Sequence, residues 1–532
     1  MKQSDNFEER VPETDVEADP SPEKEIIHII EETRDVAEQE TQLGVIQAMR
    51  MYPKAMFWSV FISLAVIMAG YDAQLIFSFY AVPSFQEKYG VLYKGSWEIT
   101  APWQVGLGMG GPIGQIIGPL AAGWPMERWG RKAVLFFCNI MVIGVIFIQF
   151  FAPSLGVLCA GEILAGVIWG IFVTISPTYA SEVSPTALRG ILTAFTNMAF
   201  VIGQFIAQGV TAGFEGRPDK WAYKAPFAIQ WLWPLLMLAG LTFAPESPWW
   251  LVRRGRLQDA RRSLEKLAWS DGGINLDAAL NFIEQTDRLE KAYQTESSYL
   301  DCFKGPNRRR TEICMMAYAI QVICGNSMIG YCNYFFELAG LQPAEAFNMG
   351  VGNTAIGFVA TALCWVLLSF FGRRTIYNYG LYIMTLILFI IGFLDIAPNY
   401  NTNPNFAWGQ ASLLDVWTFF YQLTVGPITF VIISEVSSTR LRSRSIALAT
   451  AVQSVAALIS TVIVPYMFNP QNGNLRGKIG FFFGGLSLIS AVWCHFRLPE
   501  TNHRTFEEID IMFERRVSTK DFKKYDAFTV DS

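Results

Sequence analysis

Residues 181–190 read Ser-Glu-Val-Ser-Pro-Thr-Ala-Leu-Arg-Gly, and residues 434–443 repeat them, little altered, as Ser-Glu-Val-Ser-Ser-Thr-Arg-Leu-Arg-Ser. Two shorter motifs return at nearly the same spacing: Gly-Arg-Lys at 130–132 as Gly-Arg-Arg at 372–374, and Pro-Glu-Ser at 245–247 as Pro-Glu-Thr at 499–501. Repetition at a nearly fixed spacing predicts a duplicated architecture. Each copy closes an apolar stretch, so we interpret the duplicated unit as a set of membrane helices with its polar loops.

The composition places much of the chain in lipid. Of its 532 residues, 52% are hydrophobic and 16% are charged, and the mean hydropathy is +0.28. An α-helix needs about 20 apolar residues to cross a hydrocarbon core of about 30 Å. The sequence predicts twelve such spans, six before residue 250 and six after residue 312. They cover residues 56–80, 103–124, 133–152, 156–180, 191–213, 226–244, 313–336, 350–371, 379–396, 413–433, 445–468 and 478–497.

Polar segments divide the chain around these spans. We expect an acidic, disordered tail at 1–50, a six-helix bundle at 51–250, a cytoplasmic linker with short helices at 251–312, a second six-helix bundle at 313–498 and a tail at 499–532. Basic residues are concentrated in alternate loops, which predicts that both termini are cytoplasmic. No targeting signal is recognised in the sequence, which favours the plasma membrane.

Several functional classes have no support in the sequence. The eight cysteines form no Cys-x-x-Cys pair, the three histidines are scattered, and no metal-ligand spacing occurs. No nucleophile paired with a base is visible, and no phosphate-binding loop. The basic run at 308–310 abuts the seventh span, which fits a membrane anchor rather than a nucleic-acid site. We therefore expect a monomer that is not an enzyme, with no metal, no cofactor and no nucleic-acid partner.

Five stretches of the sequence carry a resemblance to a known family. Residues 123–132, Gly-Trp-Pro-Met-Glu-Arg-Trp-Gly-Arg-Lys, resemble the signature loop of the major facilitator superfamily, with Glu127 in the place of an aspartate. Residues 177–190, 245–251 and 499–501 resemble the sugar porters of that superfamily, and residues 225–234 resemble its fungal α-glucoside (maltose-type) permeases. The resemblance implies an all-α membrane protein with twelve transmembrane helices in two six-helix pseudo-symmetric halves, the major facilitator fold.

The resemblance also implies a charge network that latches the cytoplasmic ends of the helices. A carboxylate ringed by arginines can bridge to a helix end and hold one state of a gate. The second-half loop has Ser369-Phe370-Phe371 before its glycine and lacks the acid, so we expect that half of the latch to be weaker. The predicted gate residues are Glu127, Arg131, Glu182, Arg189, Glu246, Arg373, Glu435, Arg442 and Glu500.

Asp72 lies about midway along the first predicted span, where a carboxylate costs about 2.5 to 3.5 kcal/mol on insertion scales. Protonation removes this cost, so the side chain can bind and release a proton as its exposure alternates. A structural acid is the alternative; we favour proton coupling, which the resemblance supports. Glu162 stands where sugar porters commonly have an arginine, and we expect it to titrate as a second group. Ala69 and Gln115 replace further acids of maltose-type symporters, so a facilitator remains an alternative.

Amides and aromatic rings are expected to bind the solute, because amides both donate to and accept from hydroxyls and rings stack on a pyranose. Helix-to-helix hydrogen bonding is the alternative role for each amide. Phe430 stands where many hexose carriers have tryptophan, which favours a wider site. Trp169, Trp231 and Trp233 are expected to pack between helices or at the interface. The predicted solute residues are Asn197, Gln204, Gln208, Gln321, Asn326, Ser327, Tyr331, Phe430 and Gln453.

The sequence therefore predicts a secondary active transporter that moves an α-glucoside such as maltose with a proton, by alternating access. Three alternatives stay open: a transporter of another sugar-like or glycosylated secondary metabolite, a facilitator, and a non-transporting sugar sensor. The sensor is disfavoured because sensors on this scaffold usually carry a long signalling tail, and only residues 502–532 follow the last repeated motif.

Overall fold

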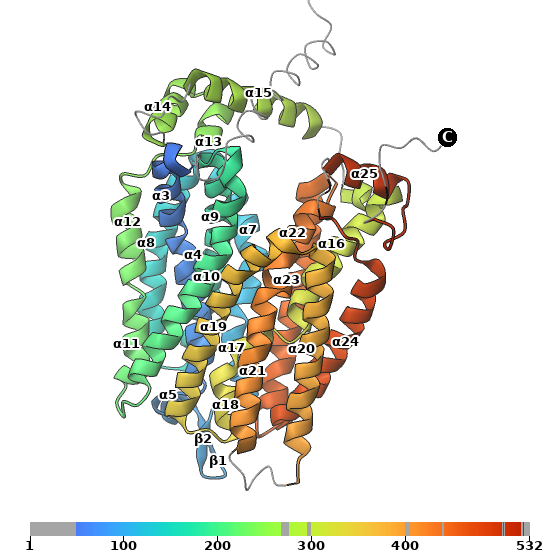
Figure 1. Cartoon of the computed structure of the whole chain (residues 1–532). Helices are drawn as coiled ribbons and strands as arrows, with labels where there is room; N and C mark the ends of the chain where they lie inside the picture. Colours follow the sequence, from blue (N-terminus) through green and yellow to red (C-terminus); the bar gives the residue numbers. More distant parts are fainter. Residues whose placement is uncertain are drawn as a thin grey trace, which may run out of the picture.

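The computed structural model describes residues 49–267, 276–294, 299–398, 405–438, 441–502, 504, 506–522 and 525. Nearly all of the predicted tail at 1–50, and the last residues of the predicted tail at 499–532, therefore lie outside the described part of the chain. The described residues form a bundle of long helices, in which the first half runs from blue to green and the second from yellow to red (Figure 1).

The first half contains six spans, and several of them are broken into two helices. The breaks fall at Ser63 in the first span, at Met109 in the second and at residues 230–231 in the sixth. The spans are α3 (Pro53–Ile62) with α4 (Leu64–Phe79), α6 (Ala101–Gly108) with α7 (Gly110–Trp129), α8 (Arg131–Phe150), α9 (Leu155–Val183), α10 (Thr186–Phe214), and α11 (Trp221–Ile229) with α12 (Leu232–Leu241).

The second half contains the other six spans. Its first span is broken twice, at residues 324–326, where Gly325 has a φ of +115°, and again at Tyr331. Glycine suits the first break because it adopts positive φ without a steric penalty. The spans are α16 (Gly305–Ile323) with α17 (Ser327–Gly330) and α18 (Cys332–Ala339), α19 (Pro343–Phe370), α20 (Arg373–Ile396), α21 (Asn405–Leu423) with α22 (Val425–Val436), α23 (Arg442–Phe468) and α24 (Ile479–Arg497).

Each predicted apolar run coincides with a helix or a broken helix. Within the described residues, ten helical segments are long and apolar enough to cross a membrane. The other two spans are the fifth, α10, which carries the amides Asn197, Gln204 and Gln208, and the sixth, in which α11 and α12 are each short. Amides lower the hydropathy of a helix and a break shortens it, so these two spans depart most from a simple apolar pattern.

The two ends of the bundle differ (Figure 1). One end, which we call the linker face, carries α13 (Pro248–Arg253), α14 (Leu257–Leu267), α15 (Leu276–Gln294), the 3-10 turn η1 (Tyr299–Phe303) and α25 (Phe506–Glu514). The opposite end, which we call the hairpin face, carries α5 (Pro83–Tyr89) and the antiparallel strands β1 (Val91–Tyr93) and β2 (Ser96–Glu98), with Leu92 opposite Trp97. Short helices thus occur within the predicted linker at 251–312.

The linker helices are attached to the first half of the bundle. Arg253 of α13 forms an ion pair with Asp287 of α15 at 3.4 Å, and the Arg254 guanidinium donates to the carbonyl oxygen of Arg128 at 2.9 Å. The turn η1, in contrast, packs against α16 and α23 of the second half. The chain therefore passes from one half to the other between α15 and η1.

Glycines let α7 and α9 approach each other backbone to backbone. Gly118 of α7 faces Gly170 of α9, and a Cβ at Gly118 would lie 2.6 Å from the backbone of Gly170. At Gly114 and Gly166, an added Cβ would overlap a carbonyl oxygen of the other helix. Small residues at four-residue spacing are typical of closely packed membrane helices. The second and fourth spans are thus joined by direct backbone contact.

We expect Gly166→Ala to destabilise the protein by about 1–3 kcal/mol, because an added methyl group would force α7 and α9 apart. Gly144 of α8 is the matched control, since no described atom lies within 4 Å of the position its Cβ would take. Thermal unfolding of the purified chain in detergent measures both variants. Equal midpoints for Gly166→Ala and Gly144→Ala would show that the backbone contact does not hold these helices together.

Candidate functional site

Asp72 is buried in α4, and both of its carboxylate oxygens are held by neutral donors. The indole N–H of Trp169 in α9 donates to Oδ2 at 2.7 Å. The amide of Gln230, at the break between α11 and α12, donates to Oδ1 at 2.6 Å. The side chain is 2% exposed, so water does not screen its charge. Hydrogen bonds from neutral groups stabilise a carboxylate but leave its charge uncompensated.

Glu162, the second predicted titrating group, is near enough to this carboxylate to interact with it electrostatically. It is buried in α9, and the Gln149 amide of α8 donates to its Oε1 at 2.7 Å. Gln149 also interacts with Asp72, and the two carboxylates are close enough to repel each other when both are ionised. A proton on either group removes that repulsion. The arrangement can therefore hold a proton inside the first half.

Gln321 and Gln453 come together in the second half. The Gln321 amide of α16 donates to the carbonyl oxygen of Gly426, at the start of α22, at 2.8 Å, and the Gln453 amide of α23 donates to Gln321 Oε1. The Tyr421 hydroxyl donates to the Gln321 carbonyl oxygen at 3.0 Å. Asn326, which precedes α17, and Ser327, its first residue, are half-buried. Gln321 and Gln453 thus form a connected pair of amides within the predicted solute wall.

Gln208 belongs to a different polar group. Asn333 of α18 donates from its amide to Gln208 Oε1 at 2.8 Å and to the Ser78 hydroxyl at 3.4 Å. Asn333 is not among the predicted solute residues, and helical spacing from Asn326 does not indicate it, because the span is broken between them at Tyr331. The other amides of α10, Asn197 and Gln204, are half-buried. The predicted α10 amides thus do not form a single contact group with Gln321 and Gln453.

The two predicted aromatic residues occupy different environments. Tyr331 is fully buried, with ring centroids 4.8 Å from Phe77 and 5.8 Å from Tyr80, both in the first half. Its hydroxyl has no hydrogen-bond partner among the described residues. Phe430 is 43% exposed and lies edge-on to Tyr318, with centroids 5.7 Å apart. Tyr331 therefore joins the two halves, whereas Phe430 presents an accessible ring.

Direct contacts close the hairpin face between the halves. Besides the Tyr331 stack and the Asn333 bonds, the Gln74 amide donates to the Gly330 carbonyl oxygen at 3.4 Å. The Asn469 amide donates to the Ile99 carbonyl oxygen, beside the hairpin, at 2.9 Å. At the linker face, the ribbons of the two halves diverge (Figure 1). The protein is therefore closed at its hairpin face in this conformation.

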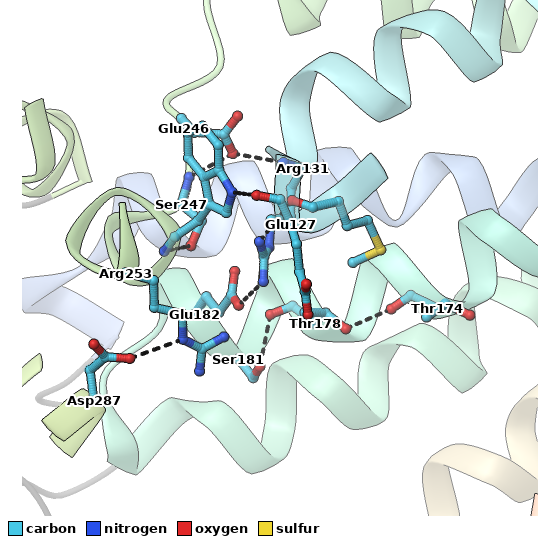
Figure 2. Close-up of polar contacts among 12 residues, drawn as sticks. Glu127, Arg131, Thr174, Thr178, Ser181, Glu182, Glu246, Ser247, Arg253 and Asp287 are labelled. Atoms are coloured by element: carbon cyan, nitrogen blue, oxygen red, sulfur yellow. Dashed lines mark hydrogen bonds and ion pairs between the residues drawn. The ribbon is translucent and has the colours of Figure 1, made fainter. Parts of the chain in front are cut away.

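The predicted charge network exists at the linker face, and the first half holds one part of it (Figure 2). Arg131 forms a buried ion pair with Glu182 at 2.7 Å and donates to the Met126 carbonyl oxygen at 3.1 Å. Glu246 accepts the backbone N–H groups of Arg131 at 3.1 Å and of Lys132 at 3.2 Å, which caps the N-terminus of α8. Burial raises the pKa of Glu246, and hydrogen bonds from backbone N–H groups oppose that shift.

The second half repeats this arrangement with the residues that the sequence repeat pairs. Arg373 forms an ion pair with Glu435 at 3.1 Å, and the Thr501 hydroxyl donates to the same carboxylate at 2.6 Å. Glu500 lies at the start of α20, where a Cβ on Gly372 would overlap its carboxylate. Each network lies within its own half. The duplication seen in sequence is therefore also a duplication of contacts.

Three predicted gate residues stand apart from these pairs. Glu127 is exposed, and its carboxylate has no hydrogen bond or ion pair within the described residues; only its backbone carbonyl accepts a bond, from Trp250 at 2.7 Å (Figure 2). Arg442 is half-buried at the start of α23, near Asp510. Arg189 lies in α10, but its side chain is outside the described part of the structure. Glu246, rather than Glu127, is the acid at the helix end.

A family model described as "Sugar (and other) transporter" matches residues 58–513. The chain belongs to this family of sugar transporters. A maltose permease of Saccharomyces cerevisiae is 37% identical to the transporter over 509 residues, which cover 94% of this chain and 82% of that protein. An alpha-glucosides permease of the same species is 37% identical over 517 residues, covering 95% and 85%. The transporter is not an enzyme, in agreement with the sequence analysis.

Solved structures confirm the fold of the transporter. The xylose transporter XylE from E. coli, in a partially occluded inward open conformation, has a TM-score of 0.68 at 21% identity and covers 85% of this chain and 99% of that one. The proton:xylose symporter XylE bound to 6-bromo-6-deoxy-D-glucose has a TM-score of 0.67 at 22% identity, covering 87% and 100%. The predicted twelve-helix fold of two pseudo-symmetric halves is thereby confirmed.

Trp169, Gln230 and Gln149 are the functional candidates that the sequence analysis missed. The expectation that Trp169 only packs between helices is incomplete, because its indole N–H donates to Asp72. One signal was available: Trp169 lies seven residues after Glu162, which places both near one face of α9. No comparable signal marks Gln230, because its contact with Asp72 depends on the break in the sixth span.

We expect Glu182→Gln to destabilise the transporter by about 3–5 kcal/mol, because it leaves the Arg131 guanidinium buried without its carboxylate. The side chains of Arg131 and Glu182 are 5% and 9% exposed, whereas those of Arg373 and Glu435 are 21% and 18% exposed. Glu435→Gln should therefore cost less. Thermal unfolding midpoints in detergent show which of the two variants is less stable.

Glu127→Gln is the matched control for this series. Its carboxylate is exposed, so the change should alter stability by no more than about 0.5 kcal/mol. A Glu127→Gln variant as unstable as Glu182→Gln would contradict the assignment of Glu182, rather than Glu127, to the stabilising network.

Proposed function

We propose that the transporter imports an α-glucoside such as maltose together with a proton, by alternating access across the plasma membrane. Helix ends at the linker face carry basic residues, namely Arg128 near the end of α7, Arg131 and Lys132 at the start of α8, and Arg373 and Arg374 at the start of α20. The positive-inside rule supports a cytoplasmic location for that face and for both termini. The hairpin face is then extracellular. With the hairpin face closed, the conformation is inward-facing.

The buried carboxylate of Asp72 carries the proposal of proton coupling. Its two donors, Trp169 and Gln230, are neutral, and its titratable neighbour, Glu162, would carry a charge of the same sign when ionised. An ionised Asp72 is therefore costly whenever the first half excludes water, and protonation removes that cost. A proton bound while the site faces outward would permit the return to the inward-facing state. Release toward the cytoplasm would then complete one coupled cycle.

The sugar assignment rests on the relatives and on the amides. A maltose permease and an alpha-glucosides permease are each 37% identical to this chain over most of their length. Gln321 and Gln453 lie next to each other, each with both donor and acceptor atoms, which suits vicinal hydroxyls. Phe430 supplies an exposed ring for the apolar face of a pyranose. These groups belong to helices of the second half, whereas the proton site belongs to the first.

We expect Asp72→Asn to abolish accumulation of maltose against its gradient while sparing exchange of maltose across the membrane. The asparagine cannot exchange a proton, but its size and its hydrogen bonds resemble those of the protonated acid. Radiolabelled maltose uptake into proteoliposomes with an imposed proton gradient measures accumulation, and counterflow without a gradient measures exchange.

Asp219→Asn is the control, because Asp219 is exposed near the hairpin face and pairs with Arg217. It should accumulate maltose as the unmodified chain does. Undiminished accumulation by Asp72→Asn would rule out coupling through Asp72. If the unmodified chain takes up maltose at the same rate with and without a proton gradient, the protein is a facilitator.

We expect Gln453→Leu to raise the KM for maltose by about 2- to 10-fold, because one hydrogen bond contributes about 0.5–1.5 kcal/mol. Asn139→Ala is the control, since the Asn139 amide in α8 donates to the Leu135 carbonyl oxygen of its own helix at 2.7 Å. Initial uptake rates over a range of maltose concentrations give both values. An unchanged KM in Gln453→Leu would remove Gln453 from the solute site.

A further inference from the structure

Asp415 is a third buried carboxylate within the membrane helices, and the proposed cycle does not use it. It lies in α21 and is 7% exposed. The Asn353 amide of α19 donates to Asp415 Oδ1 at 2.8 Å and also to the Thr418 hydroxyl at 2.9 Å. Like Asp72, this carboxylate is held by a neutral amide. A carboxylate without a compensating cation inside a membrane protein is a candidate for a functional site.

Asp415 lies behind the segment that closes the hairpin face. The helix α18 packs against both α19 and α21. Its first residue, Cys332, interacts with Asp415, and its second residue, Asn333, forms the bonds to Gln208 and Ser78 of the first half. A single short helix therefore packs against the helix that carries the carboxylate and also bonds to the opposite half of the transporter.

The groups around Asp415 offer no charge compensation. On α18 the facing titratable group is the Cys332 thiol, and on α19 the partner is the neutral amide of Asn353. Helices α20 and α22, which also pack against α21, place no charged side chain against Asp415 in the described structure. The Oδ1 atom of Asn353 has no hydrogen-bond partner among the described residues. A protonated Asp415 would have an O–H donor for such an acceptor.

We propose that Asp415 is a second proton-binding site, which takes its proton from the extracellular side and whose occupancy favours closure of the hairpin face. When α18 moves away to open this face, water reaches the carboxylate and stabilises its ionised form. When α18 returns, the carboxylate is dehydrated, and the neutral acid is the form that tolerates burial. Protonation therefore favours the closed face, and ionisation favours the open one. The inference uses the proposed orientation but does not require coupling through Asp72.

The separation of the two halves at the hairpin face tests this proposal. Spin labels at Ser96→Cys and Asn472→Cys, both exposed and in opposite halves, report the distance across the face in the full-length transporter in lipid nanodiscs. Between pH 8 and pH 5 we expect the population to shift from longer to shorter distances. The ratio of the two populations should change by up to about tenfold per pH unit where the site titrates.

Asp415→Asn should populate the short distance at both pH values, because the asparagine is always neutral. Asp415→Ser gives the same test if the asparagine variant does not fold, and Asp415→Glu, which retains a carboxyl, should restore the pH response. A response that survives in Asp415→Asn or Asp415→Ser, or its absence from the unmodified chain, would overturn the proposal.

Asp72→Asn in the same labelled chain separates this proposal from the proposed coupling. We expect it to keep the pH response of the distance, even though it loses accumulation of maltose. Loss of the response in Asp72→Asn would assign the titration to Asp72 and overturn the role of Asp415. Failure of Asp72→Asn to affect accumulation would refute coupling through Asp72 while leaving the distance experiment unaffected.

Discussion

A charge removed from water needs a partner of opposite sign, and this constraint separates two kinds of acid in the transporter. At the linker face, Glu182 and Glu435 are paired with arginines, so their charges are compensated within one half of the bundle. Inside the membrane helices, the hydrogen-bond donors to Asp72 and Asp415 among the described residues are neutral groups. The first kind of acid stabilises one arrangement of helices. The second kind has a charge whose cost depends on hydration, and hydration is what changes when a transporter alternates its access.

The contacts that the two halves share stabilise the helix bundle, whereas the candidate functional groups differ between the halves. The arginine–carboxylate pairs, and the acids beneath Gly130 and Gly372, occur at corresponding positions in both halves. The buried acid pair belongs to the first half, and the amides joined at Gln321 belong to the second. If the proposed proton and sugar sites lie on different halves, they can influence each other only through the relative position of the halves. This division is consistent with coupling by rigid-body motion rather than by direct contact between the two ligands.

Sequence reasoning recovered the features that depend on local pattern and on the repeat. Apolar runs located the spans, and the repeat correctly matched Arg131 and Glu182 with Arg373 and Glu435. Contacts that depend on where a helix is broken, or on which way its faces point, could not be predicted from the sequence. Gln230 reaches Asp72 because the sixth span is interrupted beside it, and Tyr331 stacks between the halves rather than beside Gln321. Helical periodicity assigns a residue to a face of its own helix but does not say which helix lies opposite that face.

The attachment of α15 to the first half and of η1 to the second has a mechanical consequence. Four residues, 295–298, connect the end of α15 to the start of η1. At roughly 3.3–3.6 Å per residue, this connection can extend to no more than about 18 Å. While both attachments hold, the two halves cannot separate at the linker face beyond what this tether permits. The covalent chain thus limits how far the linker face can open, and its length would tune the amplitude of the transport cycle.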